Sequence, residues 1–205
     1  MLIREGISGI LAALCVSLGG CVFLSCENRM AGAFLFSVAL LTVCCFGFSL
    51  YTGRIGWILE KHSRRDLAAL FCGLAGNLAG SALFGLLARA GLPALAEKAE
   101  ALCVGKLAQT IPEALIRAFF CGVLMYAAVW IFKVRGSAIG ILLCIPTFIL
   151  SGFEHAIADA FYFAAAAEPS LQSIFYLFLV LSGNTADGCL IPCLQKLTKE
   201  RTENA

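Results

Sequence analysis

The feature of this sequence that most restricts its fold is a series of six long apolar blocks. They occupy residues 7–23, 31–59, 67–88, 114–132, 138–167 and 171–194. A helix needs about 20 mainly apolar residues to cross the hydrocarbon core of a bilayer. Charged residues make up only 14% of the chain and its mean hydropathy is +0.91, whereas a soluble domain carries about 25% charge. We therefore exclude a water-soluble fold and predict an all-α membrane protein with six transmembrane helices, forming one domain over residues 1–205.

The basic residues between the blocks predict the orientation of the chain. If the N-terminus is cytoplasmic, nine Lys and Arg residues fall in cytoplasmic segments and four in external ones. The cytoplasmic group is Arg4, Lys61, Arg64, Arg65, Lys133, Arg135, Lys196, Lys199 and Arg201, and the external group is Arg29, Arg89, Lys98 and Lys106. Because cytoplasmic loops carry an excess of Lys and Arg, we expect a multi-pass protein of the cell (inner or plasma) membrane with both termini in the cytoplasm. Residues 92–112 then form an external loop, with a short surface helix at 93–102.

Charge and cysteine content exclude several other classes. A net charge of +2 leaves no basic surface for nucleic acid. Most of the eleven cysteines are scattered through the apolar blocks, where cysteine behaves as a small hydrophobe. No pair has CxxC spacing and no cluster has metal-ligand spacing, so we expect no metal site and no cofactor. The first block lacks a clear cleavage site, which favours a membrane span over a signal peptide.

Two blocks are too long for a single span. Blocks 31–59 and 138–167 each hold about 30 residues, more than modest tilt accommodates, and each contains a break signal. The breaks are LYTG at positions 50–53 and SGFEH at positions 151–155. A broken helix frees backbone groups that hydrocarbon cannot satisfy, so such breaks occur where they face protein or a polar cavity. They indicate a pathway through the membrane.

A repeated motif relates the two halves of the chain. The sequence GNLAG at 76–80 recurs as GNTADG at 183–188, which places Asn77 and Asn184 107 residues apart. The same offset superimposes the first block on the fourth and the front of the second on the fifth. We predict two inverted three-helix repeats, at about 7–91 and 113–196, with broken helices 2 and 5 and a site between them near the midplane. The asparagines either tie closely packed helices together, or line the pore or satisfy the breaks.

The breaks carry the residues best suited to chemistry. Glu154 and His155 are ionisable groups inside a predicted span, where such groups are rare and usually functional. We expect the imidazole to reach the lumen and the carboxylate to hold backbone or a cation; the alternative is a buried pair satisfied by backbone amides. Thr52 offers a hydroxyl in the other break, or bonds to its own helix.

Other polar and apolar residues lie near the breaks. Arg54, Asp159 and Asp187 are polar candidates, with an ion-paired structural role as the alternative for the two acids. Apolar side chains there form either dry constrictions that gate charged species or ordinary packing. They are Phe36, Leu40, Leu50, Tyr51 and Phe148.

Together these motifs resemble the formate/nitrite transporter family over about residues 7–194. The sequence SGFEHAIAD at 151–159 is the most specific match, and LYTG, the two GN motifs and AVW at 128–130 fall in the same order. The resemblance implies an aquaporin-like six-helix protomer that assembles as a homopentamer in the lipid bilayer. Each protomer would then have its own pore for small monovalent anions of weak acids, such as formate, nitrite, hydrosulfide, acetate or lactate.

The resemblance also implies roles for individual residues. His155 is similar to the central pore histidine of the family, and Thr52 to the hydroxyl opposite it. Lys106 resembles the lysine that makes the outer mouth attractive to anions, and Glu154 the acid that supports this lysine. The implied outer constriction is Phe36, Met125 and Phe148, and the inner one is Leu40, Leu50 and Tyr51.

Three positions depart from the family pattern. Gly122 and Asp159 stand where asparagine is usual, and Asp187 stands where glycine is usual. A second carboxylate near Lys106 would weaken the positive field, so we expect altered anion selectivity or altered pH dependence.

The sequence thus predicts a non-enzymatic pore through which a small weak-acid anion moves passively or with a proton. A bare anion pays a large desolvation cost at an apolar ring, whereas the neutral acid pays little. His155 either supplies the proton or donates a hydrogen bond. The alternatives are a pore for a small neutral solute, and an intramembrane enzyme in which His155 acts with Glu154 or Asp159. No recognisable nucleophile or metal constellation accompanies those residues.

Overall fold

The computed structural model describes residues 1–59 and 63–203, and most of these residues are helical. The elements are α1 (Leu2–Ser25), α2 (Arg29–Phe46), α3 (Tyr51–Arg54), the 3₁₀ helix η1 (Ile55–Leu59), α4 (Arg64–Gly91), α5 (Pro93–Leu107), α6 (Ile111–Arg135), α7 (Ile139–Leu150), α8 (Ala156–Ala165) and α9 (Leu171–Glu203). Of the basic residues used to predict the orientation, Lys61 lies outside the described residues, as do the side chains of Lys199 and Arg201.

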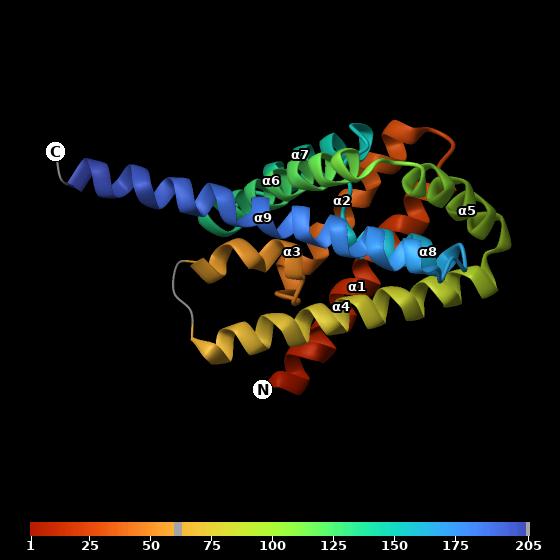
Figure 1. Ribbon diagram of the computed structural model, residues 1–205, viewed down its shortest axis with the longest axis horizontal. Helices are drawn as coiled ribbons and strands as arrows, with labels where there is room; N and C mark the ends of the chain where they lie inside the picture. Colours follow the sequence, from red (N-terminus) through yellow and green to blue (C-terminus); the bar gives the residue numbers. More distant parts are fainter. Residues whose placement is uncertain (60–62, 204–205) are drawn as a thin grey trace.

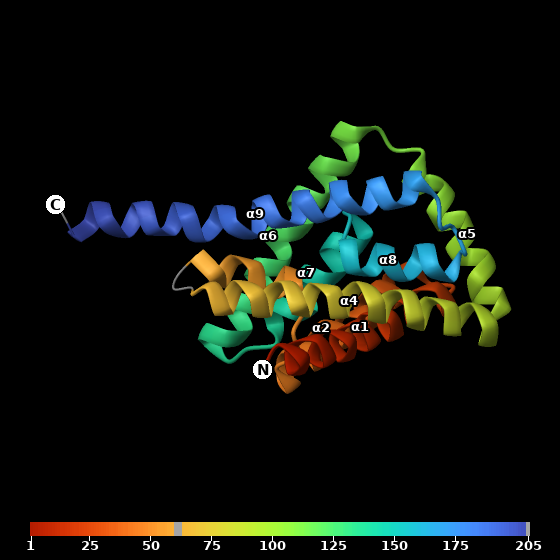
Figure 2. The ribbon, with the colours of Figure 1, turned by 60° about the horizontal axis from the view of Figure 1, so that its bottom comes forward.

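The helices form an elongated bundle (Figure 1). Helix α1 packs against α2 and α4, and α6 packs against α7 and α9. Helix α5 closes one end of the bundle, and α9 runs away from it toward the C-terminus at the other end (Figures 1 and 2). The short helices α3 and α8 lie inside this frame, and nearly all residues of α8 are buried.

Five helices of the described chain are long and apolar enough to cross a membrane, namely α1, α2, α4, α6 and α9. The predicted block 138–167 instead forms two shorter apolar helices, α7 and α8. The predicted block 31–59 forms α2, α3 and η1. The two blocks that looked too long for one span are therefore divided among shorter helices.

The position of the first interruption differs from the prediction. Helix α2 ends at Gly47, which has a left-handed conformation with φ of 70°, and such a conformation stops a helix and favours glycine. The non-helical residues are 47–50, and Tyr51, Thr52 and Gly53 already belong to α3. The second interruption comprises residues 151–155, as predicted. The predicted surface helix 93–102 is α5 and continues to Leu107.

Local signals in the sequence explain where the long helices begin. Ser63 and Asp66 form a capping box at the start of α4, and Thr110 and Glu113 form one at the start of α6. In each box the hydroxyl accepts from the third backbone N–H of the helix, and the acid accepts from the cap residue. These reciprocal bonds set the first turn of α4 and of α6.

Glycines allow α1 and α4 to approach backbone to backbone. A Cβ atom at Gly76 would overlap the carbonyl oxygen of Gly6, and one at Gly9 would overlap that of Gly73. Small residues at such crossings are typical of helix pairs in membranes. This close approach brings Asn77 within reach of the backbone of α1.

Candidate functional site

Asn77 joins the first interruption to the helices around it. Its Oδ1 accepts from the backbone N–H of Tyr51 at 2.9 Å, and its Nδ2 donates to the carbonyls of Gly9 and Ser49, both at 2.8 Å. The side chain is fully buried. One amide therefore satisfies backbone groups of the interruption and also ties α4 to α1.

Asn184 makes the corresponding contacts at the second interruption. Its Oδ1 accepts from the N–H of Ala156 at 3.0 Å, and its Nδ2 donates to the carbonyls of Ala118 at 2.8 Å and Glu154 at 2.9 Å. Each asparagine thus ties helices together and bonds backbone groups of an interruption, and neither lines the cavities described below.

His155, at the end of the second interruption, meets Thr52, which lies in α3 just after the first interruption. Thr52 Oγ1 lies 2.8 Å from His155 Nε2, and the two residues are 2% and 4% exposed. His155 Nδ1 accepts a hydrogen bond from the N–H of Ala158 at 3.3 Å, which caps the start of α8. An accepting Nδ1 leaves the proton of a neutral imidazole on Nε2. In this tautomer His155 donates from Nε2 toward Thr52.

Lys106 lies between two carboxylates. Its Nζ forms ion pairs with Glu154 and, at 2.8 Å, with Asp159 Oδ1. Gln109 Nε2 donates to the other oxygen of Glu154 at 2.7 Å. Burial lowers the pKa of Lys106, but the carboxylates of Asp159 and Glu154 raise it more strongly, so the net shift is upward and the ammonium stays charged. The second carboxylate that the sequence places near this lysine is in direct contact with it.

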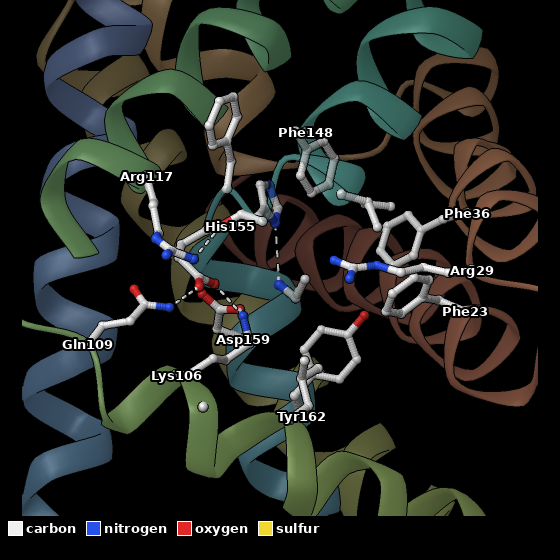
Figure 3. A pocket seen from close by; sticks show the side chains of 17 residues that line it. Phe23, Arg29, Phe36, Lys106, Gln109, Arg117, Phe148, His155, Asp159 and Tyr162 are labelled. Carbon is white, nitrogen blue, oxygen red and sulfur yellow. Dashed lines mark hydrogen bonds and ion pairs between the residues drawn. The ribbon is translucent and has the colours of Figure 1, made fainter. Parts of the chain in front are cut away.

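A cavity of about 260 Å³ lies beside this cluster (Figure 3). Its lining includes His155, the Lys106 cluster, and the rings of Phe36, Phe148 and Tyr162. Phe36 and Phe148 pack edge to face with ring centroids 6.3 Å apart, and Phe148 lies 6.1 Å from His155.

A second cavity has a volume of about 180 Å³. Leu40, Leu50 and Gly53 contribute to its lining. His155 lines the first cavity, and Leu50 and Gly53, close to Thr52 in the chain, line the second, so the buried histidine–threonine pair lies next to both cavities.

Two of the predicted constriction residues lie elsewhere. Met125 is buried on α6 and lines neither of these cavities. Tyr51 lines neither cavity, and its hydroxyl lies 3.0 Å from Thr185 Oγ1. Met125 belongs to the buried apolar core, and the Tyr51 hydroxyl contacts α9.

The remaining polar candidates occupy different environments. Arg54 lines the second cavity and pairs with Glu5 at 2.7 Å. Asp159 is ion-paired with Lys106, whereas no ion pair of Asp187 exists in the described part of the chain. Asp187 lies against Gly122, where an added Cβ would come within 2.7 Å of its Oδ2. The two departures at 122 and 187 are thus in contact, and the missing side chain at Gly122 makes room for Asp187.

Sequence reasoning missed four residues with polar side chains that line the first cavity. Gln109 follows the lysine by one helical turn, which is a local signal, but the other three depend on how distant helices pack. The four are Arg29, Gln109, Arg117 and Tyr162.

No group of three or more His, Cys, Asp or Glu side chains is arranged to hold a metal ion within the described residues. Apolar helices, two interruptions tied by asparagines, and a buried polar pair between two cavities define a multi-pass membrane protein of the channel and transporter class. The family model for formate/nitrite transporters matches residues 3–196, so the chain belongs to that family. This membership confirms the resemblance in the sequence and the prediction that the protein is not an enzyme.

Two curated relatives support this placement. An uncharacterised transporter, YrhG of Bacillus subtilis strain 168, is 30% identical over 154 residues, covering 68% of this chain and 58% of its own length. The formate channel FocB of Escherichia coli K12 is 27% identical over 149 residues, covering 65% of this chain and 53% of its own. The match thus spans little more than half the length of these relatives.

Solved structures show the same fold. A pentameric formate channel with formate bound superposes with a TM-score of 0.80 at 18% identity, covering 97% of both chains. An ion channel of the same family also reaches a TM-score of 0.80, at 22% identity, covering 97% of this chain and 89% of its own. These matches confirm the all-helical membrane fold.

Proposed function

We propose that this protein is a channel for small monovalent anions of weak acids, such as formate, nitrite or hydrosulfide. The observation that carries the proposal is the 2.8 Å contact between His155 and Thr52, buried between two cavities. A solute that moves from one cavity to the other must pass this pair. The Nε2–H of His155 can then donate to an anion in place of Thr52.

Proton linkage follows from the apolar rings around the pair. Phe36 and Phe148 lie on the side of the first cavity, and Leu40 and Leu50 on that of the second. A carboxylate stripped of water in such surroundings is costly, whereas its neutral acid is not. His155 would therefore assist the crossing either as an imidazolium, which forms with a proton from solution and passes that proton to the anion, or by hydrogen bonding the anion from its neutral Nε2–H. Flux would rise as pH falls because more neutral acid forms.

The fold supports an inverted-repeat description of this channel. The repeats would cover about residues 7–91 and 113–196 of one domain, with 92–112 between them. In each half the asparagine of the GN motif makes one accepting and two donating contacts to backbone. Helices α2 with α3 and α7 with α8 would then be the broken second and fifth of six spans, as in an aquaporin-like pore.

The expected assembly is a homopentamer in the cell membrane, with both termini cytoplasmic. The matching formate channel is described as pentameric. Large apolar side chains are exposed on the outer helices, among them Phe71 and Phe178, and lipid or neighbouring protomers would cover them. Arg64 and Arg65, at the start of α4, lie at the end of the bundle away from α5, toward which the C-terminus also extends (Figure 1). This arrangement agrees with cytoplasmic termini.

Flux into proteoliposomes that contain the purified full chain tests the proposal. Formate, nitrite, hydrosulfide and lactate are compared with glycerol as a neutral solute, at several pH values, and empty liposomes give the background. We expect saturable anion flux that increases as pH falls. A pH-independent flux of glycerol without anion flux would contradict the proposal and identify a pore for neutral solutes.

A further inference from the structure

Lys106 cannot be the cation that attracts anions to the first cavity. One ammonium contacts two carboxylates, those of Glu154 and Asp159. With both acids ionised this cluster carries a net charge of −1, and with one of them protonated it is neutral. In neither state does it present positive charge to the cavity.

Arg29 is a cation at this cavity that has no protein partner among the described residues. It is the first residue of α2, is exposed, and lines the cavity. Figure 3 shows its side chain entering the cavity beside Phe23 and Phe36, across from the Lys106 cluster. Its guanidinium makes no hydrogen bond or ion pair with any other described residue. The other guanidinium of the lining, Arg117, already donates to the carbonyl of Gly152 at 3.3 Å.

Tyr162 provides a second unused group. It is 6% exposed and lines the cavity from α8, and Figure 3 shows its hydroxyl pointing into the space that Arg29 enters. Within the part of the chain that the structure describes, this hydroxyl has no hydrogen-bond partner. A hydroxyl that faces a cavity and has no protein partner is available to a ligand or to water.

We propose that Arg29 and Tyr162 form an outer binding subsite that is selective for planar anions with two oxygens. Carboxylates and nitrite match the two parallel N–H groups of a guanidinium, whereas hydrosulfide offers a single acceptor atom. The rings of Phe23 and Phe36 form apolar walls beside the guanidinium. This inference rests on the proposed channel function and assigns the substrate preference of its mouth to Arg29 and Tyr162.

The test is initial flux into proteoliposomes as a function of anion concentration, at constant ionic strength. In R29Q we expect the half-saturating concentration of formate to rise about tenfold, since the local field that concentrates the anion is removed. R29K keeps the charge but loses the planar guanidinium with its two parallel N–H groups, so its half-saturating concentration of formate should rise less than that of R29Q. Y162F should also raise this concentration. The half-saturating concentration of hydrosulfide should change less than that of formate in both R29Q and Y162F.

R89Q is the matched control. Arg89 lies near the end of α4 that leads into α5, pairs with Glu100 at 2.9 Å, and does not line the cavity. We expect its half-saturating concentration to equal that of the wild type. An equal shift in R29Q and R89Q, an unchanged value in R29Q, or equal shifts for formate and hydrosulfide would each overturn the subsite.

Binding is measured separately from transport. Nitrite should raise the melting temperature of the detergent-purified wild type and should not raise that of R29Q. If the wild type moves no anion, the proposed function fails, and the subsite is then tested only by the effect of nitrite on the two melting temperatures. Equal stabilisation of both proteins by nitrite would refute it.

Discussion

Replacing Asn184 by alanine should destabilise the protein far more than the loss of a small side chain suggests. The substitution removes three hydrogen bonds of 2.8–3.0 Å from a side chain that is 1% exposed. Two partners, the N–H of Ala156 and the carbonyl of Glu154, lie at the start of α8, where helical bonds do not satisfy them. An unsatisfied buried group costs about 1–3 kcal/mol, so the loss amounts to about 2–6 kcal/mol.

Thermal unfolding in detergent, followed by fluorescence-detected size exclusion, measures this loss. A protein of this size loses about 2–4 °C of melting temperature per kcal/mol, so N184A should melt roughly 5–20 °C below the wild type. Asn77→Ala should behave similarly, because its contacts correspond. Ser182→Ala on the same helix removes only an exposed 2.8 Å bond to its own helix and serves as the control. A melting temperature of N184A equal to that of S182A would refute the reasoning.

Three further predictions concern packing, charge and the pore. Gly76→Ala forces a Cβ atom into the carbonyl oxygen of Gly6 on α1 and should lower the free energy of unfolding by about 1–3 kcal/mol. Gly91→Ala is the control, because its Cβ meets no atom within 4 Å. Equal melting temperatures of the two variants would contradict the packing argument. Lys106→Met leaves two buried carboxylates without a counter-charge and should cost about 3–5 kcal/mol, whereas Asp159→Asn keeps the pair with Glu154 and should cost far less. Equal decreases in melting temperature for Lys106→Met and Asp159→Asn would count against this charge arrangement. Thr52→Val removes the partner of His155 and should reduce formate flux about five- to tenfold, as expected for about 1 kcal/mol, and undiminished flux would show that the hydroxyl is dispensable.

Much of the fold follows from the sequence because bilayer thickness limits helix length. Block 138–167 was identified as too long, and it does divide, into α7 and α8. The end of α2 was placed too late, because the interruption depends on the left-handed conformation of Gly47, which a single glycine in an apolar run does not reveal. The capping boxes at Ser63 and Thr110, by contrast, are local patterns that the sequence contains in full.

The candidate site was only partly predictable. Asn77, Asn184 and the two interruptions could be found through the repeat, since one offset relates them. The free cation Arg29 could not, because its position at the cavity depends on how α2 packs against α1 and α7. Similarly, the departures at Gly122 and Asp187 are visible in the sequence, but their contact appears only when α6 and α9 are placed together.

The most direct test of the account is formate flux from pH 5 to pH 8 for the wild type and for His155→Phe, which keeps an aromatic ring but has no exchangeable proton. We predict that wild-type flux rises as pH falls, above the background of empty liposomes, and that H155F has lost this pH dependence together with most of its flux. Equal flux of the two proteins at every pH would contradict the central role of His155.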